Sequence, residues 1–252
     1  GRIHVTSEKE KLDKVLAAIP PATLALEPFS VQAEPESVEI DLQRTAVVVI
    51  DMQNCFVSKG GMFDLWGWDI SVCQKVIEPI KRITTAARAK GMKVVNVAHI
   101  YNHDLSDTGG KNSPNWYKDT SLPSHREHPE WGDKFYIDGT WGADIIDELK
   151  PQKGDLFVVK PRYSAFWQTN LHNLLQFYSV KYLIFMGVAT NVCVEHSLRD
   201  AYNYEYFPIL ISDASGHVGP PFTQDATITN IQYVYGWVAT TENILKAIEA
   251  KE

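Results

Sequence analysis

Gly187-Val188-Ala189-Thr190-Asn191-Val192-Cys193-Val194-Glu195 is the stretch around which the rest of the chain is organised. The apolar run Tyr182-Leu183-Ile184-Phe185-Met186 precedes it, and apolar residues at helical spacing follow it. This pattern places Cys193 where a buried strand passes into the first turn of a helix. Backbone N–H groups at that position lack partners, and the helix dipole favours negative charge. We therefore expect the thiol pKa of Cys193 to fall from about 8.5 toward neutrality, which would make the sulfur a nucleophile.

A buried cysteine with only a packing role is the alternative interpretation. Two distant segments favour the catalytic one, because the run Thr45-Ala-Val-Val-Val-Ile ends in Asp51 and the run Leu-Phe-Val-Val after Asp155 ends in Lys160. A parallel strand that is buried on both faces reads as a continuous apolar run, and its C-terminal end meets the cleft. The three strands would deliver Asp51, Lys160 and Cys193 to one edge of one sheet.

Strand and helix patterns alternate through the chain, which predicts a single-domain three-layer α/β/α fold with a mainly parallel, roughly six-stranded sheet. Strands are expected at 45–50, 93–98, 155–160, 182–186, 207–211 and 236–239. Helices are expected at 76–87, 143–149, 170–178 and 225–235, with a last helix that Thr241 caps. Residues 56–67 are interpreted as a loop beside the site. The long stretch 99–139 is interpreted as pocket wall and lid.

The first 42 residues differ from the rest. Ser7-Glu8-Lys9-Glu10 has the form of a capping box, and apolar residues at helical spacing follow until Pro20-Pro21. The Pro-punctuated segment to Leu42 is expected to be an extended arm over the domain or toward a partner subunit. The predicted division is thus 1–42 for the N-terminal helix and arm, and 43–252 for the main domain.

Composition excludes several classes of function. The net charge is −7 and no basic run is longer than two residues, so nucleic-acid binding is not expected. The three cysteines, Cys55, Cys73 and Cys193, show no paired spacing, which favours a reducing compartment over a disulfide framework. No signal segment and no apolar run long enough to span a bilayer is found, so we expect a cytoplasmic protein without a membrane partner.

These motifs resemble the isochorismatase-like cysteine hydrolases, whose signatures are a strand ending in D-x-Q, a strand ending in K, and G-[IV]-[AT]-T-[ND]-x-C. Within that superfamily the chain most resembles the ureidoacrylate amidohydrolases and the related biuret and triuret hydrolases. The resemblance covers the chain from about residue 42 to residue 247. Beyond the triad, the shared segments are Gly60-Gly61, Gly109-Gly110, Ser113-Pro114-Asn115-Trp116, Gly139-Thr140-Trp141, Lys160-Pro161-Arg162-Tyr163-Ser164 and Gly219-Pro220-Pro221-Phe222.

The resemblance implies a cysteine amidohydrolase that works through a thioester. Cys193 would attack the carbonyl, Asp51 would manage protons, and Lys160 would hold Asp51 ionised. The resemblance also implies an oxyanion hole from the backbone N–H groups of Ala189 and Cys193, and a cis peptide between Val188 and Ala189. No cofactor is expected. A metal is not expected either, because the Asp and His residues that nicotinamidase relatives carry after the second strand are matched here only by His99 and His103.

The expected substrate is a small ureido compound, and two classes stay open: ureidoacrylate, and biuret or triuret. An N-carbamoyl amino acid is a further alternative, followed by nicotinamidase or isochorismatase chemistry and a catalytically silent binding module. Nine residues are predicted to contact the substrate: Gln53, Phe56, Met62, His99, Tyr101, Asp107, Asn115, Arg162 and Tyr163. Met62, His99, Tyr101 and Asp107 depart from the ureidoacrylate pattern, which suggests an altered pocket. A homo-oligomer, dimer or tetramer, is expected.

Overall fold

The computed structural model describes residues 28–250, and its centre is a six-stranded sheet in the order β5-β4-β3-β6-β7-β8. Every neighbouring pair in this sheet is parallel. The strands are β3 (Thr45–Ile50), β4 (Lys93–His99), β5 (Leu156–Lys160), β6 (Tyr182–Val188), β7 (Phe207–Gly216) and β8 (Trp237–Ala239). The predicted α/β architecture is confirmed, and each strand expected from an apolar run is present, with β7 extending five residues further than predicted.

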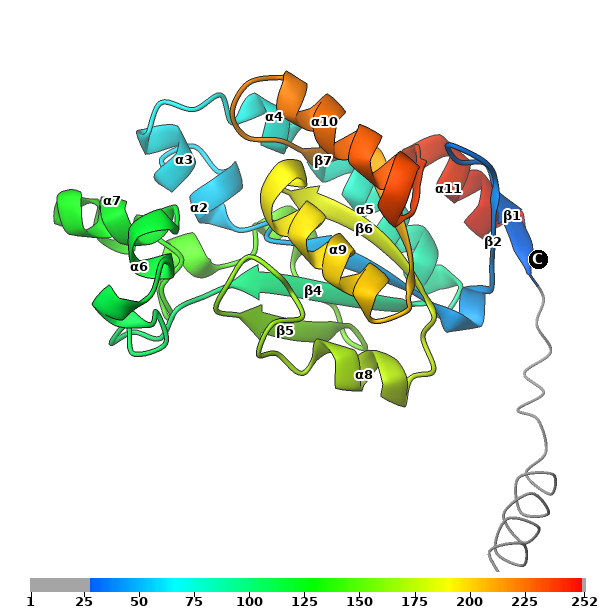
Figure 1. The fold of residues 1–252 in the computed structure, drawn as a ribbon, viewed down its shortest axis with the longest axis horizontal. Coiled ribbons are helices and arrows are strands. Elements are labelled where there is room, and N and C mark those ends of the chain that lie inside the picture. The colour runs from blue at the N-terminus through cyan, green and yellow to red at the C-terminus, as the bar shows by residue number, and fades with distance from the viewer. Residues whose placement is uncertain (1–27, 251–252) are drawn as a thin grey trace, which may run out of the picture.

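Helices cover both faces of the sheet (Figure 1). Successive side chains of β3 point to opposite faces and pack against different helices. Val47 and Val49 pack with α5 (Ile77–Ala89) and α11 (Thr241–Glu249) on one face. Val48 and Ile50 pack with α8 (Leu171–Phe177) and α9 (Glu195–Asn203) on the other. All six residues of β3 are buried, as a central strand between two helical layers must be.

A small antiparallel sheet precedes the main one. It consists of β1 (Phe29–Val31) and β2 (Val38–Ile40). The described part of the segment that we expected to be an extended arm therefore forms a hairpin whose buried Val31 and Ile40 join the core beside α11. Glu34, in the connection between the two strands, pairs with Val238 of β8. The helix expected between the capping box and Pro20 lies outside the described residues.

The connections at the carboxyl edge of the sheet are richer in short helices than the sequence indicated. The prediction of a loop at 56–67 is wrong in part, because this segment contains one single-turn helix and the end of another. The prediction of a helix at 143–149 is wrong, because two short 3-10 turns, η4 (Trp141–Ala143) and η5 (Asp147–Leu149), occupy this part of the chain.

The remaining elements are α2 (Asn54–Val57), α3 (Met62–Leu65), α4 (Ser71–Gln74), α6 (Asn115–Lys118), α7 (Ser121–Glu127), α10 (Phe222–Asn230) and the turns η1 (Leu42–Arg44), η2 (Gly110–Asn112), η3 (Pro129–Lys134), η6 (Thr190–Val194) and η7 (Ile231–Tyr235).

The long connection after β4 holds α6, α7 and η3, which lie beyond the ends of β4 and β5 (Figure 1). This is the position expected for a lid over the carboxyl edge of the sheet. The last helix has its cap one residue earlier than predicted, since the Thr240 hydroxyl accepts a hydrogen bond from the N–H of Asn243. None of the described helices is long and apolar enough to cross a bilayer.

Candidate active site

Three strand ends bring an aspartate, a lysine and a cysteine into contact. Asp51 follows β3, Lys160 ends β5, and Cys193 lies one turn beyond β6. The Lys160 ammonium lies 2.8 Å from Asp51 Oδ2 and donates a hydrogen bond to Cys193 Sγ at 3.4 Å. All three side chains are buried. A parallel sheet assembles this group because every strand ends at the same edge.

The charges of these groups depend on one another. Lys160 stays an ammonium: burial alone would lower its pKa, but the negative charge of Asp51 and the hydrogen bonds to Asp51 and Cys193 outweigh burial and raise that pKa. Burial raises the pKa of Asp51, and the Lys160 charge and hydrogen bond offset part of that rise. A carboxylate with a raised pKa is a better proton acceptor near neutral pH than an exposed one.

The expected low pKa of the Cys193 thiol is wrong. Burial raises that pKa well above its usual value, and the charge of Asp51 adds to the rise, while Lys160 opposes it. The Cys193 side chain is buried at the carboxyl edge of the sheet and is not exposed to solvent at the start of the helix. The resting sulfur is therefore a thiol, and it needs Asp51 to take its proton as it attacks.

The turn that carries Cys193 is unusual in its backbone. The Val188–Ala189 peptide is cis, as the resemblance implied. Thr190–Val194 forms a π-helical turn before α9 begins, a feature common at functional sites. Gly187 has φ of 121°, and a Cβ there would lie 2.1 Å from the Ile50 carbonyl oxygen. Only glycine lets β6 approach β3 so closely, just before Asp51.

A small cavity opens beside the catalytic group. Its free space of about 20 Å³ holds roughly one water molecule. A ureide is several times larger, so side chains of the lid must move for it to enter. The lining residues are Asp51, Phe56, Phe63, His99, Thr120, Tyr163, Val188, Ala189, Val192, Cys193 and Val218. Phe56, His99 and Tyr163 are thus the predicted substrate contacts that the structure brings to the catalytic group.

The other predicted contacts lie outside this lining. Gln53 is fully buried and clamps the end of β4, since its amide nitrogen donates to the carbonyls of His99 and Ala143 and its oxygen accepts from the His99 N–H. Met62 belongs to the hydrophobic core. Asn115 donates to the Tyr101 hydroxyl.

The two charged residues that were predicted to contact the substrate, Asp107 and Arg162, instead form hydrogen bonds with backbone groups in the lid or next to it. The Asp107 carboxylate accepts from the backbone N–H of Asn102. The Arg162 guanidinium donates to the carbonyls of Asp107 and Pro161, and it lies over the ring of Trp167 at 4.9 Å.

Sequence reasoning missed several residues of the site. Phe63, Thr120, Val192 and Val218 line the cavity, and Asp119 lies just behind it. Val218 immediately precedes the shared Gly219-Pro220-Pro221-Phe222 segment, which was a usable signal. No sequence signal pointed to Thr120 or Asp119, because their part of the lid shows neither helical nor strand periodicity.

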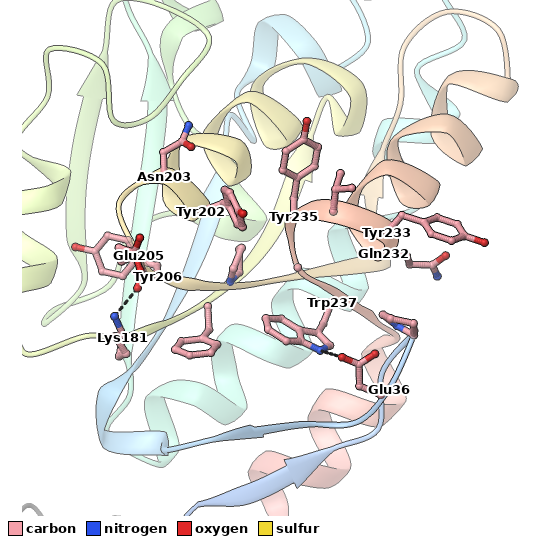
Figure 2. A pocket seen from close by; sticks show the side chains of 15 residues that line it. Glu36, Lys181, Tyr202, Asn203, Glu205, Tyr206, Gln232, Tyr233, Tyr235 and Trp237 are labelled. Atoms are coloured by element: carbon pink, nitrogen blue, oxygen red, sulfur yellow. Dashed lines mark hydrogen bonds between the residues drawn. The ribbon is translucent and has the colours of Figure 1, made fainter.

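A second, wider hollow of about 680 Å³ lies at the opposite edge of the sheet (Figure 2). Its wall includes Tyr202, Tyr233, Tyr235 and Trp237, and the Trp237 indole donates to Glu36. The residues that line it are close to the starts of β6, β7 and β8, where parallel strands rarely place catalytic groups. This hollow is therefore separate from the catalytic group, since its lining contains none of Asp51, Lys160 and Cys193.

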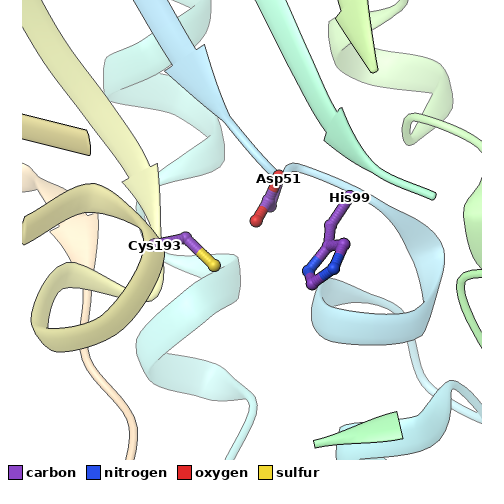
Figure 3. Close-up of side chains that lie close together, drawn as sticks. All are labelled: Asp51, His99 and Cys193. Carbon is purple, nitrogen blue, oxygen red and sulfur yellow. The ribbon is translucent and has the colours of Figure 1, made fainter. Parts of the chain in front are cut away.

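One cluster of the described residues has the composition of a metal site. One ligand atom each from Asp51, His99 and Cys193 lie within 4.8 Å of one another (Figure 3). The Lys160 ammonium, however, contacts two of these three side chains. A cation placed among them would have to displace or repel that ammonium. The donor set therefore fits a proton-transfer site better than a metal site.

Comparison with known proteins places this geometry in a family. The isochorismatase domain model matches residues 45–243. A ureidoacrylate amidohydrolase, RutB, from Serratia proteamaculans is 43% identical over 222 residues, covering 88% of this chain and 90% of that protein. The protein of the same name from Agrobacterium fabrum is 43% identical over 220 residues, covering 87% and 96%.

Solved structures agree with the sequence relatives. A cysteine hydrolase from Pseudomonas syringae pv. phaseolicola superposes with a TM-score of 0.71 at 30% identity, covering 84% of this chain and 95% of that one. An N-carbamoylsarcosine amidase from Thermoplasma acidophilum, at 24% identity and a TM-score of 0.58, shares the fold and covers 79% and 97%. The chain belongs to the isochorismatase family, among its cysteine-dependent amidohydrolases.

Proposed function

We propose that this protein hydrolyses a ureido C–N bond with Cys193 as nucleophile, Asp51 as general acid and base, and Lys160 as the cation that holds both. The observation that carries the proposal is the contact of the buried Lys160 ammonium with Asp51 and with Cys193 Sγ, two residues that line a small cavity. The curated relatives named for ureidoacrylate support a ureide as substrate.

The acylation half of the reaction starts from the Cys193 thiol and the Asp51 carboxylate, two groups whose pKa values burial raises. Cys193 Sγ attacks the ureido carbonyl carbon while its proton passes to the Asp51 carboxylate. The oxygen gains negative charge, which the N–H groups of Ala189 and Cys193 would stabilise as an oxyanion hole. The C–N bond breaks, Asp51 returns the proton to the leaving nitrogen, and a thioester remains.

The deacylation half uses the same carboxylate. Asp51 takes a proton from a water molecule as that water attacks the thioester carbonyl, and the proton then returns to the departing sulfur. Lys160 stays charged throughout and prevents Asp51 from holding its proton between steps. The products are the acid, a carbamate for a simple ureide, and ammonia or an amine.

The first prediction tests this assignment. Cys193→Ser removes the nucleophile and Asp51→Asn removes the proton acceptor, so each should lower ammonia release from ureides by a factor of about 10³ or more. Both side chains keep nearly the original shape, and the thermal midpoint measured by circular dichroism should confirm folding. Cys73→Ser, a buried thiol outside the cavity, is the control and should retain turnover. Release near the wild-type rate from either catalytic variant would refute the mechanism.

Several finer points of the assignment remain predictions. Ureidoacrylate and the biuret or triuret class are both compatible with the triad, and kcat/KM on each decides between them. Gln53, Met62, Tyr101, Asp107, Asn115 and Arg162 would act on the substrate only indirectly, through the residues that they position. The cytoplasmic location and the homo-oligomer expected from the sequence are tested by fractionation and by sedimentation.

A further inference from the structure

His99 is a buried histidine without hydrogen bonds on its ring. Its side chain is fully buried, and neither ring nitrogen has a partner among the described residues. The ring lines the cavity and lies beside Asp51 and Cys193, as Figure 3 shows. Buried polar atoms are nearly always paired in folded proteins. The ring is therefore placed to bind a ligand in the cavity.

The imidazole is neutral at physiological pH. Burial lowers the pKa of His99 well below its usual value, and the charges of Lys160 and Arg162 lower it further, while the backbone of Pro161 opposes only part of this shift. A neutral imidazole offers one N–H donor and one acceptor and carries no charge to balance an anion. His99 thus suits an amide group, which also has both a donor and an acceptor.

Asp119 stands behind His99 and was not foreseen from the sequence. Its carboxyl is buried and accepts hydrogen bonds from the Tyr136 hydroxyl and from the N–H groups of Ser121 and Leu122. Asp119 Oδ2 lies 4.0 Å from His99 Nε2. This distance is longer than a hydrogen bond, and a small rotation of the ring on substrate binding would close it.

The cations near His99 lie outside the lining of the cavity. None of the described residues that line the cavity is lysine or arginine. Lys160 lies behind Asp51 and Cys193 and pairs with both. Arg162 donates to the backbone carbonyls of Asp107 in the lid and of Pro161 just after β5. A carboxylate beside His99 would therefore face the carboxyl groups of Asp51 and Asp119 without a counter-ion of its own.

We propose that His99 and Asp119 form a substrate-selecting pair that admits a neutral ureide, rich in amide N–H groups, and disfavours one that carries a carboxylate. The inference rests on the proposed function and narrows its substrate class. His99 binds the amide of the substrate, and Asp119 acts through His99 as a positioning residue: it orients the ring and adds negative charge.

The first arm of the test compares substrates on the wild-type enzyme. Biuret represents the neutral class, and ureidoacrylate and N-carbamoyl-glycine represent the carboxylate class. We expect kcat/KM for biuret to exceed both others by a factor on the order of 100. A higher kcat/KM for ureidoacrylate would overturn the selection and leave the cysteine mechanism intact. Hydrolysis of none of the three would overturn the selection and remove its basis, the proposed function, as well.

The second arm assigns the selection to the pair. Asp119→Asn keeps the shape but removes the negative charge, so we expect kcat/KM for biuret to fall about 10-fold, mainly through KM, while that for ureidoacrylate rises or stays unchanged. A purely structural role would lower both values equally. Asp138→Asn, an exposed carboxylate on the same lid, is the matched control for net charge and should leave both values unchanged.

A third variant keeps the proposal testable if Asp119→Asn fails to fold, since that carboxyl also accepts from two backbone N–H groups. His99→Gln retains one donor and one acceptor but places them differently and breaks the link to Asp119. We expect it to raise KM for biuret about 10-fold with a smaller change in kcat. Equal kcat/KM for biuret in this variant and in the wild type would overturn the role of His99.

Discussion

Lys160 is the residue on which the charges of the site depend. Its ammonium contacts Asp51 and Cys193 at once, and it is fully buried. Burial raises the pKa of Asp51, and Lys160 offsets part of that rise. Since the base must be ionised to accept the thiol proton, Lys160 sets the lowest pH at which the enzyme works.

Lys160→Met should therefore move the acid limb of the pH–rate profile. Without the ammonium the pKa of Asp51 rises further, so activity should be lost at a pH about 1–3 units higher than in the wild type, and kcat/KM at neutral pH should fall. The measurement is kcat/KM from pH 4 to pH 10. Lys150→Met removes an exposed lysine and should change neither the limb nor the rate. An unmoved acid limb in Lys160→Met would count against this role.

The same residue predicts how the enzyme responds to chelators. Asp51, His99 and Cys193 have the right ligand atoms for a metal, but Lys160 contacts two of them. We therefore expect EDTA to leave kcat unchanged, and added zinc to inhibit, since a thiophilic ion can reach Cys193 only by competing with the ammonium. Loss of activity in EDTA that zinc restores would show that the metal belongs to the mechanism.

At the scale of elements, the contact between β3 and β6 determines where the catalytic group forms. Gly187 of β6 pairs with Ile50 of β3, the residue before Asp51. Its φ of 121° suits glycine, and a Cβ would lie 2.1 Å from the Ile50 oxygen. The two strands therefore carry Asp51 and Cys193 toward each other through a contact that has no room for a side chain.

Comparing Gly187→Ala with Gly154→Ala should separate the effect of the clash from the cost of placing alanine at a positive φ. The added carbon would push β3 and β6 apart, so we expect a loss of about 1–3 kcal/mol in the free energy of unfolding beyond the cost of the positive φ. Gly154→Ala is the control, because its φ is 96° and nothing lies within 4 Å of the added Cβ. Urea unfolding and kcat/KM measure both effects. Equal losses in the two variants would show that the close approach is unimportant.

The elements also show what the sequence could predict. The strands were found because their apolar runs are continuous; in β3 all six residues are buried between two helical layers, and the five after Thr45 are apolar. The triad followed, since the ends of parallel strands share an edge. The existence of a lid was predicted, but the contacts within it could not be: Asp119 is held by Tyr136, a residue seventeen positions away, and by local N–H groups, and neither contact leaves a periodic pattern. The Cys193 pKa was wrong because burial, a tertiary property, outweighed the local helix end.

At the scale of the whole molecule, the hairpin of β1 and β2 and the catalytic group are located at different ends. The catalytic group lies at the carboxyl edge of the sheet, whereas β1 and β2 pack beside α11 and β8 on the far side (Figure 1). Ile40 of β2 is fully buried in the core that also contains Ile244 and Ile248 of α11. The hairpin thus completes the hydrophobic core without contacting the cavity.

Ile40→Ala should weaken the fold and leave the chemistry intact. Removing a buried isoleucine side chain leaves a cavity, so the free energy of unfolding should fall by about 2–5 kcal/mol. Glu39→Ala changes the exposed neighbour on the same strand and should cost much less. Because the hairpin is remote from Cys193, kcat/KM measured well below the unfolding transition should equal the wild-type value in both variants. A lowered kcat/KM in folded Ile40→Ala would mean that the hairpin is coupled to the catalytic edge through the sheet, and that stability and catalysis in this molecule are not separable by position.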